Sequence, residues 1–162
     1  MKKKLLICML VLAFPLSELF SQVKDSIVQL APVTVTSTAM VTKEVNKAFR
    51  KSFPDAQDLK WYRQDKDYLA KFIMNDMDHN ALFKKNGYLK YDVAFGSEKN
   101  LPDAIRQQIQ SAYEEFKITR AFNVKESNRD IWVVNLEGLK NYVMVRVEDG
   151  ELEEVNKFKK AS

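Results

Sequence analysis

Few residues of this 162-residue chain have side chains that could carry chemistry. His79 is the single histidine, so any Ser-His-Asp or Cys-His site would have to use it. It follows a predicted turn at residues 75–78, at the predicted start of a strand, and the chain contains no Gly-x-Ser-x-Gly nucleophile motif. The pattern therefore predicts a surface or turn histidine rather than a catalytic one.

Acidic residues offer two further candidates. Asp76, Asp78 and Asn80 place oxygens at alternate positions, as at the start of a calcium-binding loop. The sixth position of that loop is Ala81 instead of Gly, and the twelfth is Gly87 instead of Glu, so a polar turn is the better interpretation. The carboxylates that could form an acid–base pair lie in predicted loops, where Asp is common: Asp55, Asp58, Asp65 and Asp67. We expect no enzyme, no metal site and no cofactor.

The N-terminus has the pattern of an export signal. Three lysines follow Met1, and residues 5–14 form an apolar run that is too short to span a bilayer as a helix. We predict a signal peptide over residues 1–21, hence a periplasmic or secreted protein of a Gram-negative envelope with no stable membrane anchor. An uncleaved N-terminal anchor is the alternative. Cys8, the one cysteine, lies within the apolar run, so the mature protein would have no disulfide and no thiolate site.

The composition is that of a globular protein, with 46% hydrophobic and 30% charged residues. Removal of the leader takes away Lys2, Lys3, Lys4 and Glu18 and lowers the formal net charge from +4 to +2. A net charge this small does not indicate the basic surface that nucleic-acid binding requires, so we expect no nucleic-acid partner.

The elements follow from the periodicity after an extended lead-in, residues 22–38, which could hold one edge strand. Apolar residues at helical spacing predict a helix over residues 39–52, with Thr38 or Thr42 as its cap and Pro54 after its end. Four strands follow with short connections, and such strands can only be antiparallel. They cover residues 59–64, 68–74, 79–85 and 88–95, the last two joined by Asn86-Gly87, a strong hairpin signal.

The same plan returns in the second half of the chain. Pro102 opens a second helix, capped by Asn100 or Leu101, and four strands follow near residues 121–125, 131–136, 141–147 and 151–158. Gly150 of Asp149-Gly150 lies 63 residues after Gly87. We predict an α+β protein with two repeats of one helix plus four strands, residues 39–96 and 100–160. Units this small are marginal alone, so they are expected to share a sheet of about eight strands with both helices on one face.

These residues resemble a known family. The chain is similar to the β-lactamase-inhibitor-like, PepSY-like exported proteins of Gram-negative bacteria, over residues 41–158. The residues that carry the resemblance are Val45-x-x-Ala48-Phe49-x-x-x-Phe53-Pro54-x-Ala56, Lys60-Trp61, Tyr68-x-Ala70-x-Phe72, Leu101-Pro102, Tyr113, Ile118 and Asp149-Gly150-Glu151. The resemblance implies a β-lactamase-inhibitory-protein-like fold of tandem helix-plus-four-strand units, and by analogy an inhibitor-like role. Fold does not carry function with it, and no contact residue of an inhibitor can be transferred to this chain.

Aromatic residues on the predicted strands indicate a binding surface. Adjacent Trp61 and Tyr62 point to opposite faces of a regular strand, so one of them points away from the helices. We predict that Trp61, Tyr62, Arg63 and Lys71 contribute to a protein-binding sheet face. The alternative is that the aromatic side chains pack against a loop, the N-terminal segment or a second copy.

The resulting hypothesis is a non-enzymatic exported module that binds a protein partner through its open sheet face. Its most specific version is that the module inhibits a hydrolase. The alternative is an envelope structural or stress protein that binds a small apolar ligand or lipid. A closed apolar cavity would favour the second, and an open sheet with exposed aromatic residues the first.

Overall fold

The computed structural model describes residues 35–37 and 40–161. The predicted leader and the lead-in before Val35 lie outside these ranges. The helices and strands are β1 (Val35–Ser37), α1 (Lys43–Ser52), β2 (Gln57–Gln64), β3 (Asp67–Met74), β4 (Met77–Phe83), β5 (Leu89–Gly96), the 3₁₀ turn η1 (Glu98–Asn100), α2 (Asp103–Ala112), β6 (Lys117–Glu126), β7 (Arg129–Glu137), β8 (Asn141–Glu148) and β9 (Glu151–Lys159). None of the helices in the described ranges has the length and apolar character needed to cross a bilayer.

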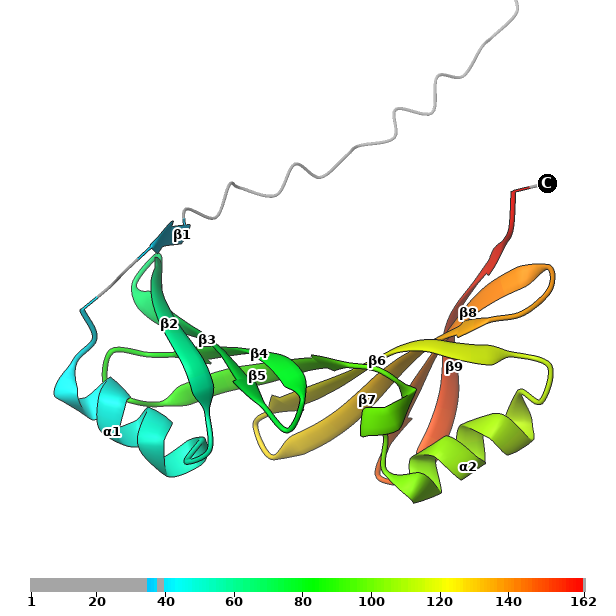
Figure 1. The fold of residues 1–162 in the computed structure, drawn as a ribbon, viewed down its shortest axis with the longest axis horizontal. Helices are drawn as coiled ribbons and strands as arrows, with labels where there is room; N and C mark the ends of the chain where they lie inside the picture. The colour runs from blue at the N-terminus through cyan, green and yellow to red at the C-terminus, as the bar shows by residue number, and fades with distance from the viewer. Residues whose placement is uncertain (1–34, 38–39, 162) are drawn as a thin grey trace, which may run out of the picture. The chain divides into compact units, whose positions relative to one another are not determined.

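The strands form one antiparallel sheet in which the spatial order equals the order along the chain, β1 to β9. Cross-strand neighbours share a face, and one row runs through Phe72, His79, Ala94, Asn123, Trp132 and Val147. Residues of this face pack against both helices, so α1 and α2 lie on the same side of the sheet (Figure 1). The predicted α+β architecture with one shared sheet is confirmed, and β1 adds a ninth strand at the edge.

Helix α1 packs its apolar stripe on the first half of the sheet. The hydroxyl of Thr42 caps it by accepting a hydrogen bond from the Val45 amide at 3.2 Å, so the helix begins at Lys43 rather than at residue 39. Val45 and Phe49 are buried, and the Phe49 ring meets the Phe72 ring edge-on at 5.1 Å between centroids. This first cluster has an aromatic core because Phe53, Trp61 and Phe83 surround the same ring.

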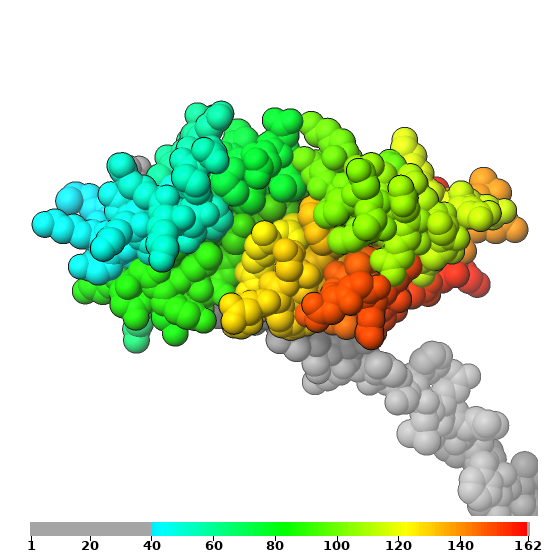
Figure 2. All heavy atoms as spheres, turned by 90° about the horizontal axis from the view of Figure 1, so that it is seen from below, coloured from blue at the N-terminus to red at the C-terminus, as the bar shows by residue number. Residues whose placement is uncertain are grey.

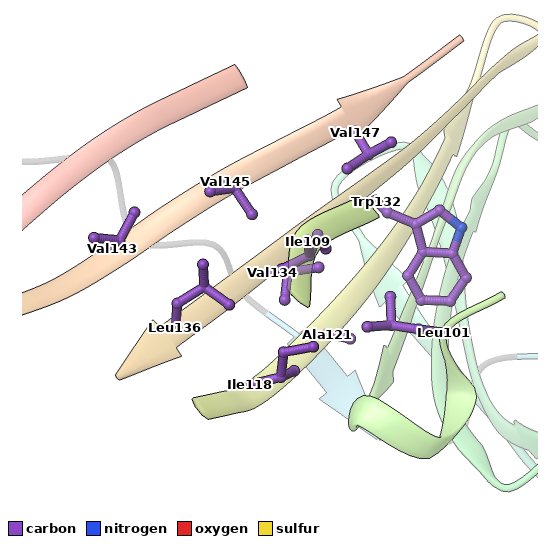
Figure 3. Close-up of a cluster of buried hydrophobic side chains, with 10 residues drawn as sticks. All are labelled: Leu101, Ile109, Ile118, Ala121, Trp132, Val134, Leu136, Val143, Val145 and Val147. Carbon is purple, nitrogen blue, oxygen red and sulfur yellow. The ribbon is translucent and has the colours of Figure 1, made fainter. Parts of the chain in front are cut away.

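Helix α2 packs on the second half against an aliphatic cluster. Ile109 of the helix lies over Val134 and its neighbours from β6, β7 and β8, and Trp132 closes the cluster beside Leu101 (Figure 3). Pro102 occupies the N-cap position, in place of the predicted Asn100 or Leu101. The reason is that Glu98–Asn100 forms a separate 3₁₀ turn, in which the Asn100 side-chain oxygen accepts a hydrogen bond from the Ser97 amide at 2.9 Å.

Three of the hairpins use two-residue turns in which both residues have positive φ, as a type I′ turn requires: Asn75-Asp76, Ser127-Asn128 and Asp149-Gly150. Asn and Asp tolerate this conformation because their short polar side chains bond locally. The twist of such turns matches the twist of the strands, which keeps the connections tight.

The Asn86-Gly87 hairpin is longer than its sequence predicts. Only Gly87 has positive φ, and its amide donates a hydrogen bond to the Lys84 carbonyl at 2.9 Å. The loop is shaped by its contact with α1, because the Thr42 hydroxyl donates to the Lys85 carbonyl at 2.9 Å. A Cβ atom on Gly87 would lie 2.8 Å from the Glu44 carbonyl oxygen. Gly87 is therefore required both by its conformation and by the close approach of the helix.

The two hairpin glycines provide a matched test. Gly150 has φ +81 and no atom within 4 Å of an added Cβ, whereas Gly87 has φ +87 and the Glu44 contact. Gly150→Ala is expected to lower the free energy of unfolding by about 1 kcal/mol through backbone strain alone. Gly87→Ala is expected to cost about 2–3 kcal/mol, because the hairpin or α1 must also shift. Chemical denaturation measures both, and equal losses would contradict the proposed packing of the hairpin on α1.

Candidate functional site

His79 lies in the core and not in a surface turn. It is on β4, its exposed fraction is 4%, and its ring stacks on Phe72 at 4.8 Å between centroids. Its Nδ1 lies 3.1 and 3.0 Å from the two carboxylate oxygens of Asp92 on β5, which is equally buried. The prediction of a surface or turn histidine is therefore wrong. The strand begins at Met77, earlier than predicted, so His79 points into the helix face.

The chemistry available to this pair is limited by its surroundings. An ionised carboxylate only accepts hydrogen bonds, so Nδ1 of His79 is the donor when the Asp92 carboxyl group is ionised. The other ring nitrogen, Nε2, is buried and has no hydrogen-bond partner among the described residues. A histidine of a Ser-His-Asp site needs a nucleophile at that nitrogen. The described residues place no hydrogen-bond partner at Nε2.

The pair belongs to a polar zone between the two apolar clusters. Asn123 follows His79 and Ala94 in the same row, and its side-chain amide donates to the Asp130 carboxylate at 2.5 Å. Figure 2 looks onto this face and shows the cyan α1 and the yellow-green α2 apart, with the yellow segment that includes the β6–β7 turn between them. The three buried polar side chains of the described residues, those of His79, Asp92 and Asn123, thus lie on the helix side of the sheet between the two apolar clusters.

The four predicted binding residues do not share one face. Tyr62 and Lys71 lie on the face opposite the helices, with the Lys71 ammonium 5.4 Å from the centre of the Tyr62 ring. Trp61 packs in the first cluster, and the Arg63 guanidinium lies 4.6 Å from the ring centre of buried Tyr68. Trp61 and Arg63 therefore lie on the helix side, as the alternation of the strand requires, and Tyr62 and Lys71 lie on the other side. A binding role for any of the four remains a prediction.

The face opposite the helices, called here the open face, carries an apolar patch that the sequence analysis missed. Two rows of three side chains cross β5, β6 and β7: Val93, Val124 and Ile131, and Phe95, Phe122 and Val133. Phe95 is 40% exposed and meets Phe122 edge-on at 5.6 Å, while the others are half-buried. No described helix packs on these residues.

A signal for this patch is present in the sequence of β5. Its larger apolar residues Tyr91, Val93 and Phe95 alternate with Asp92 and Ala94. Strands β5 and β6 thus turn their larger apolar side chains away from the helices, and their helix side includes the polar Asp92 and Asn123.

Charges flank the patch at both ends. On one side Lys60 and Lys71 are directly opposite each other on β2 and β3, and neither forms an ion pair with another described residue. On the other side Arg129 donates two hydrogen bonds to Glu148 at 2.6 and 2.8 Å, and Arg146 bonds Glu153 at 2.6 Å. The hydrogen bond from Arg129 lowers the pKa of Glu148 below its ordinary value. The first pair of charges is unmatched, and the second set is internally neutralised.

The carboxylates considered for acid–base chemistry have structural roles or lie in turns. Asp67 forms an ion pair with Lys90 at 3.1 Å, and Asp65 has positive φ in the β2–β3 turn. Asp58 lies in a bulge of β2, beside an open hollow of about 810 Å³ that also borders Lys60, Tyr62 and Lys71. Within the described residues no group of three or more His, Cys, Asp or Glu side chains is placed to hold a metal ion.

The buried pair can be tested by a double-mutant cycle. His79→Leu is expected to lower the free energy of unfolding by about 3 kcal/mol or more, because it leaves the Asp92 carboxylate buried without a partner. The double variant His79→Leu/Asp92→Leu is expected to be more stable than the sum of the single changes predicts. Chemical denaturation of all four proteins gives the coupling energy.

The exposed pair Asp67–Lys90 is the matched control for this cycle. Its side chains are 22% and 40% exposed, so removal of Asp67 is expected to cost less than about 1 kcal/mol. A His79 change no more costly than the Asp67 change would show that the buried pair does not contribute to the fold as described.

Comparison with known proteins shows which solved structures have a similar fold. No protein-family model matches the chain. No curated protein matches it either. Among solved structures, a BLIP-like protein of Bacteroides fragilis is 20% identical, with a TM-score of 0.58 over 73% of this chain and 89% of that chain. A DUF2874 family protein of Bacteroides ovatus is 19% identical, with a TM-score of 0.57 over 75% and 89%.

A third structure, from Bacteroides eggerthii, has a name that proposes a periplasmic location. It is 15% identical, with a TM-score of 0.54 over 75% of this chain and 90% of that chain. Identities this low establish fold and not function. The β-lactamase-inhibitor-like part of the resemblance drawn from the sequence is confirmed at the level of fold, and the PepSY-like part stays a prediction. The chain has the fold of the BLIP-like and DUF2874 family proteins.

Proposed function

We propose that this protein is a non-enzymatic exported module that binds a protein partner through the open face of its sheet. The observation that carries the proposal is the apolar patch of Val93, Phe95, Phe122, Val124, Ile131 and Val133. Binding energy at protein interfaces concentrates in a few aromatic and aliphatic anchors surrounded by polar groups. Phe95 and Phe122 have the position of such anchors, with charged groups at both ends of the patch.

The charges beside the patch indicate which chemical groups the partner surface should present. Lys60 and Lys71 are cross-strand neighbours of like charge, an arrangement that is unfavourable in the free protein. A carboxylate of a partner placed between them would relieve this repulsion, and Tyr62 lies beside them. The proposed partner surface therefore has an apolar centre and an acidic group at the β2–β3 end.

Three observations support a non-enzymatic exported role. The single histidine is buried against Asp92, and the described residues offer no nucleophile at its free nitrogen. The leader pattern of residues 1–21 is typical of an export signal. One structural neighbour carries a name that proposes a periplasmic location. Inhibition of a hydrolase is the sharpest form of the proposal, since a BLIP-like protein is among the neighbours.

We also propose that the two halves are copies of one repeat. Each half has one helix followed by four strands. The ladder of its first two strands is interrupted near its start, at Gln57/Lys60 and at Ile118/Arg120. The ladder of its last two strands is interrupted at Leu82/Phe83 and at Met144/Val145. Bulges are usually kept within a family, so matched bulges support duplication.

The alternative of a small apolar ligand or lipid requires a cavity that excludes water. Three hollows in the described part of the chain open to solvent and have charged residues in their lining. The exposed patch therefore favours a protein partner over a small apolar ligand. Binding of such a ligand is one of the outcomes that the experiment below would detect.

The proposal is tested by crosslinking capture from envelope and culture-fluid extracts, with the exported protein as bait. Phe95→Ser and Lys71→Glu are expected to lose a partner that the unaltered protein captures, by about tenfold or more in affinity once that partner is purified. Tyr88→Ser is the matched control, because Tyr88 is 51% exposed in the β4–β5 loop and is not part of the patch.

The captured partner would also be assayed for enzyme activity with and without the protein. A partner that binds equally to the Phe95 and Tyr88 variants would show that binding does not use the open face. No captured protein, together with a bound small molecule in native mass spectrometry, would replace the proposal by the apolar-ligand alternative.

A further inference from the structure

Strand β9 leaves one edge of the sheet without a neighbour among the described strands. Such an edge presents unpaired backbone amides and carbonyls, which another strand can use. Val155 and Phe158 on this strand are 51% and 53% exposed. Charged side chains are one means by which proteins prevent such pairing, and they act where a second copy would bring like charges together.

The charges of β9 are instead divided by sign along the strand. Its first half contains Glu151, Glu153 and Glu154, and its second half contains Lys157 and Lys159. Antiparallel strands related by a twofold axis place the first half of one strand beside the second half of the other. Two copies of β9 would therefore bring acidic residues beside basic residues twice.

A bulge makes this match geometrically possible. Residues that face each other across two strands must lie on the same side of the sheet. Glu154 pairs with Val145 and Lys157 with Val143, and both valines point to the helix face. In a regular strand, residues three apart point to opposite faces. The extra residue at Val155 corrects this, so that Glu154 and Lys157 lie on one face.

From the divided charge and the bulge we infer that two copies of this protein associate through antiparallel pairing of β9 with β9. In this arrangement Glu154 of each copy lies opposite Lys157 of the other, and Glu153 lies opposite Phe158 on the open face. The Tyr113 hydroxyl donates a hydrogen bond to Glu154 at 3.2 Å, which holds the carboxylate beside the edge. The sheets of the two copies become continuous, and both open faces point to the same side.

The association is expected to be weak and dependent on salt. One strand per copy makes an interface smaller than the roughly 1,200 Å² of stable complexes. Its charge pairs are exposed, so added salt screens them. Sedimentation of the exported protein over a range of concentrations should show a monomer–dimer equilibrium that shifts toward monomer as salt is raised.

Charge variants test the register. Lys157→Glu places two like-charged pairs across the axis and is expected to weaken dimerisation by about tenfold or more. The exchange Glu154→Lys/Lys157→Glu restores opposite charges and should restore the dimer. Lys43→Glu on the exposed side of α1 makes the same change in net charge and should leave the dimer intact. Circular dichroism and thermal unfolding confirm that each variant is folded.

Two further measurements separate this inference from the proposed function. Hydrogen exchange of the unaltered protein should slow at β9 amides as the concentration rises. Phe95→Ser should leave the dimer unchanged, whatever it does to partner binding. A protein that stays monomeric at every concentration, a Lys43→Glu variant as weakened as Lys157→Glu, or a dimer lost with Phe95→Ser would each overturn the inference.

Discussion

The backbone ladder between β5 and β6 joins the two halves of this protein. Each half has about 60 residues, a size at which burial of apolar surface barely offsets the loss of chain entropy. No cysteine follows Cys8 in the sequence, so no disulfide links the halves. Six register pairs from Tyr91–Glu126 to Gly96–Ala121 make one sheet out of two short ones. The two helix-packed clusters thereby belong to the same cooperative unit.

This joint also determines where the surface is polar and where it is apolar. Each helix covers one half of the sheet, and the strands at the joint lie between them. On the helix side of these strands the buried side chains include the polar ones of Asp92 and Asn123. The apolar side chains of the same strands point to the other side, where Phe95 and Phe122 meet. The exposed patch therefore lies on the opposite face of the strands that join the two halves.

The sequence predicted the elements correctly where a single local pattern determines the structure. The apolar stripe with Val45 and Phe49 located the first helix, and Asp149-Gly150 located a type I′ hairpin. It was a poor guide where long-range contacts decide. The burial of His79 depends on Asp92 from the next strand, and the Asn86-Gly87 loop is shaped by α1. The open-face patch required the register of three strands, which no single segment encodes.

The order of the strands has a consequence for how the protein folds. Each strand pairs with its neighbour in sequence, so most sheet contacts join residues close along the chain. The exceptions are β1 with β2 and β5 with β6, whose pairs span a helix. Local hairpins close within microseconds, whereas a longer closure has a larger entropic cost. For a β-rich protein of this size the contact order is low, and the rate of folding depends on the closure across α2.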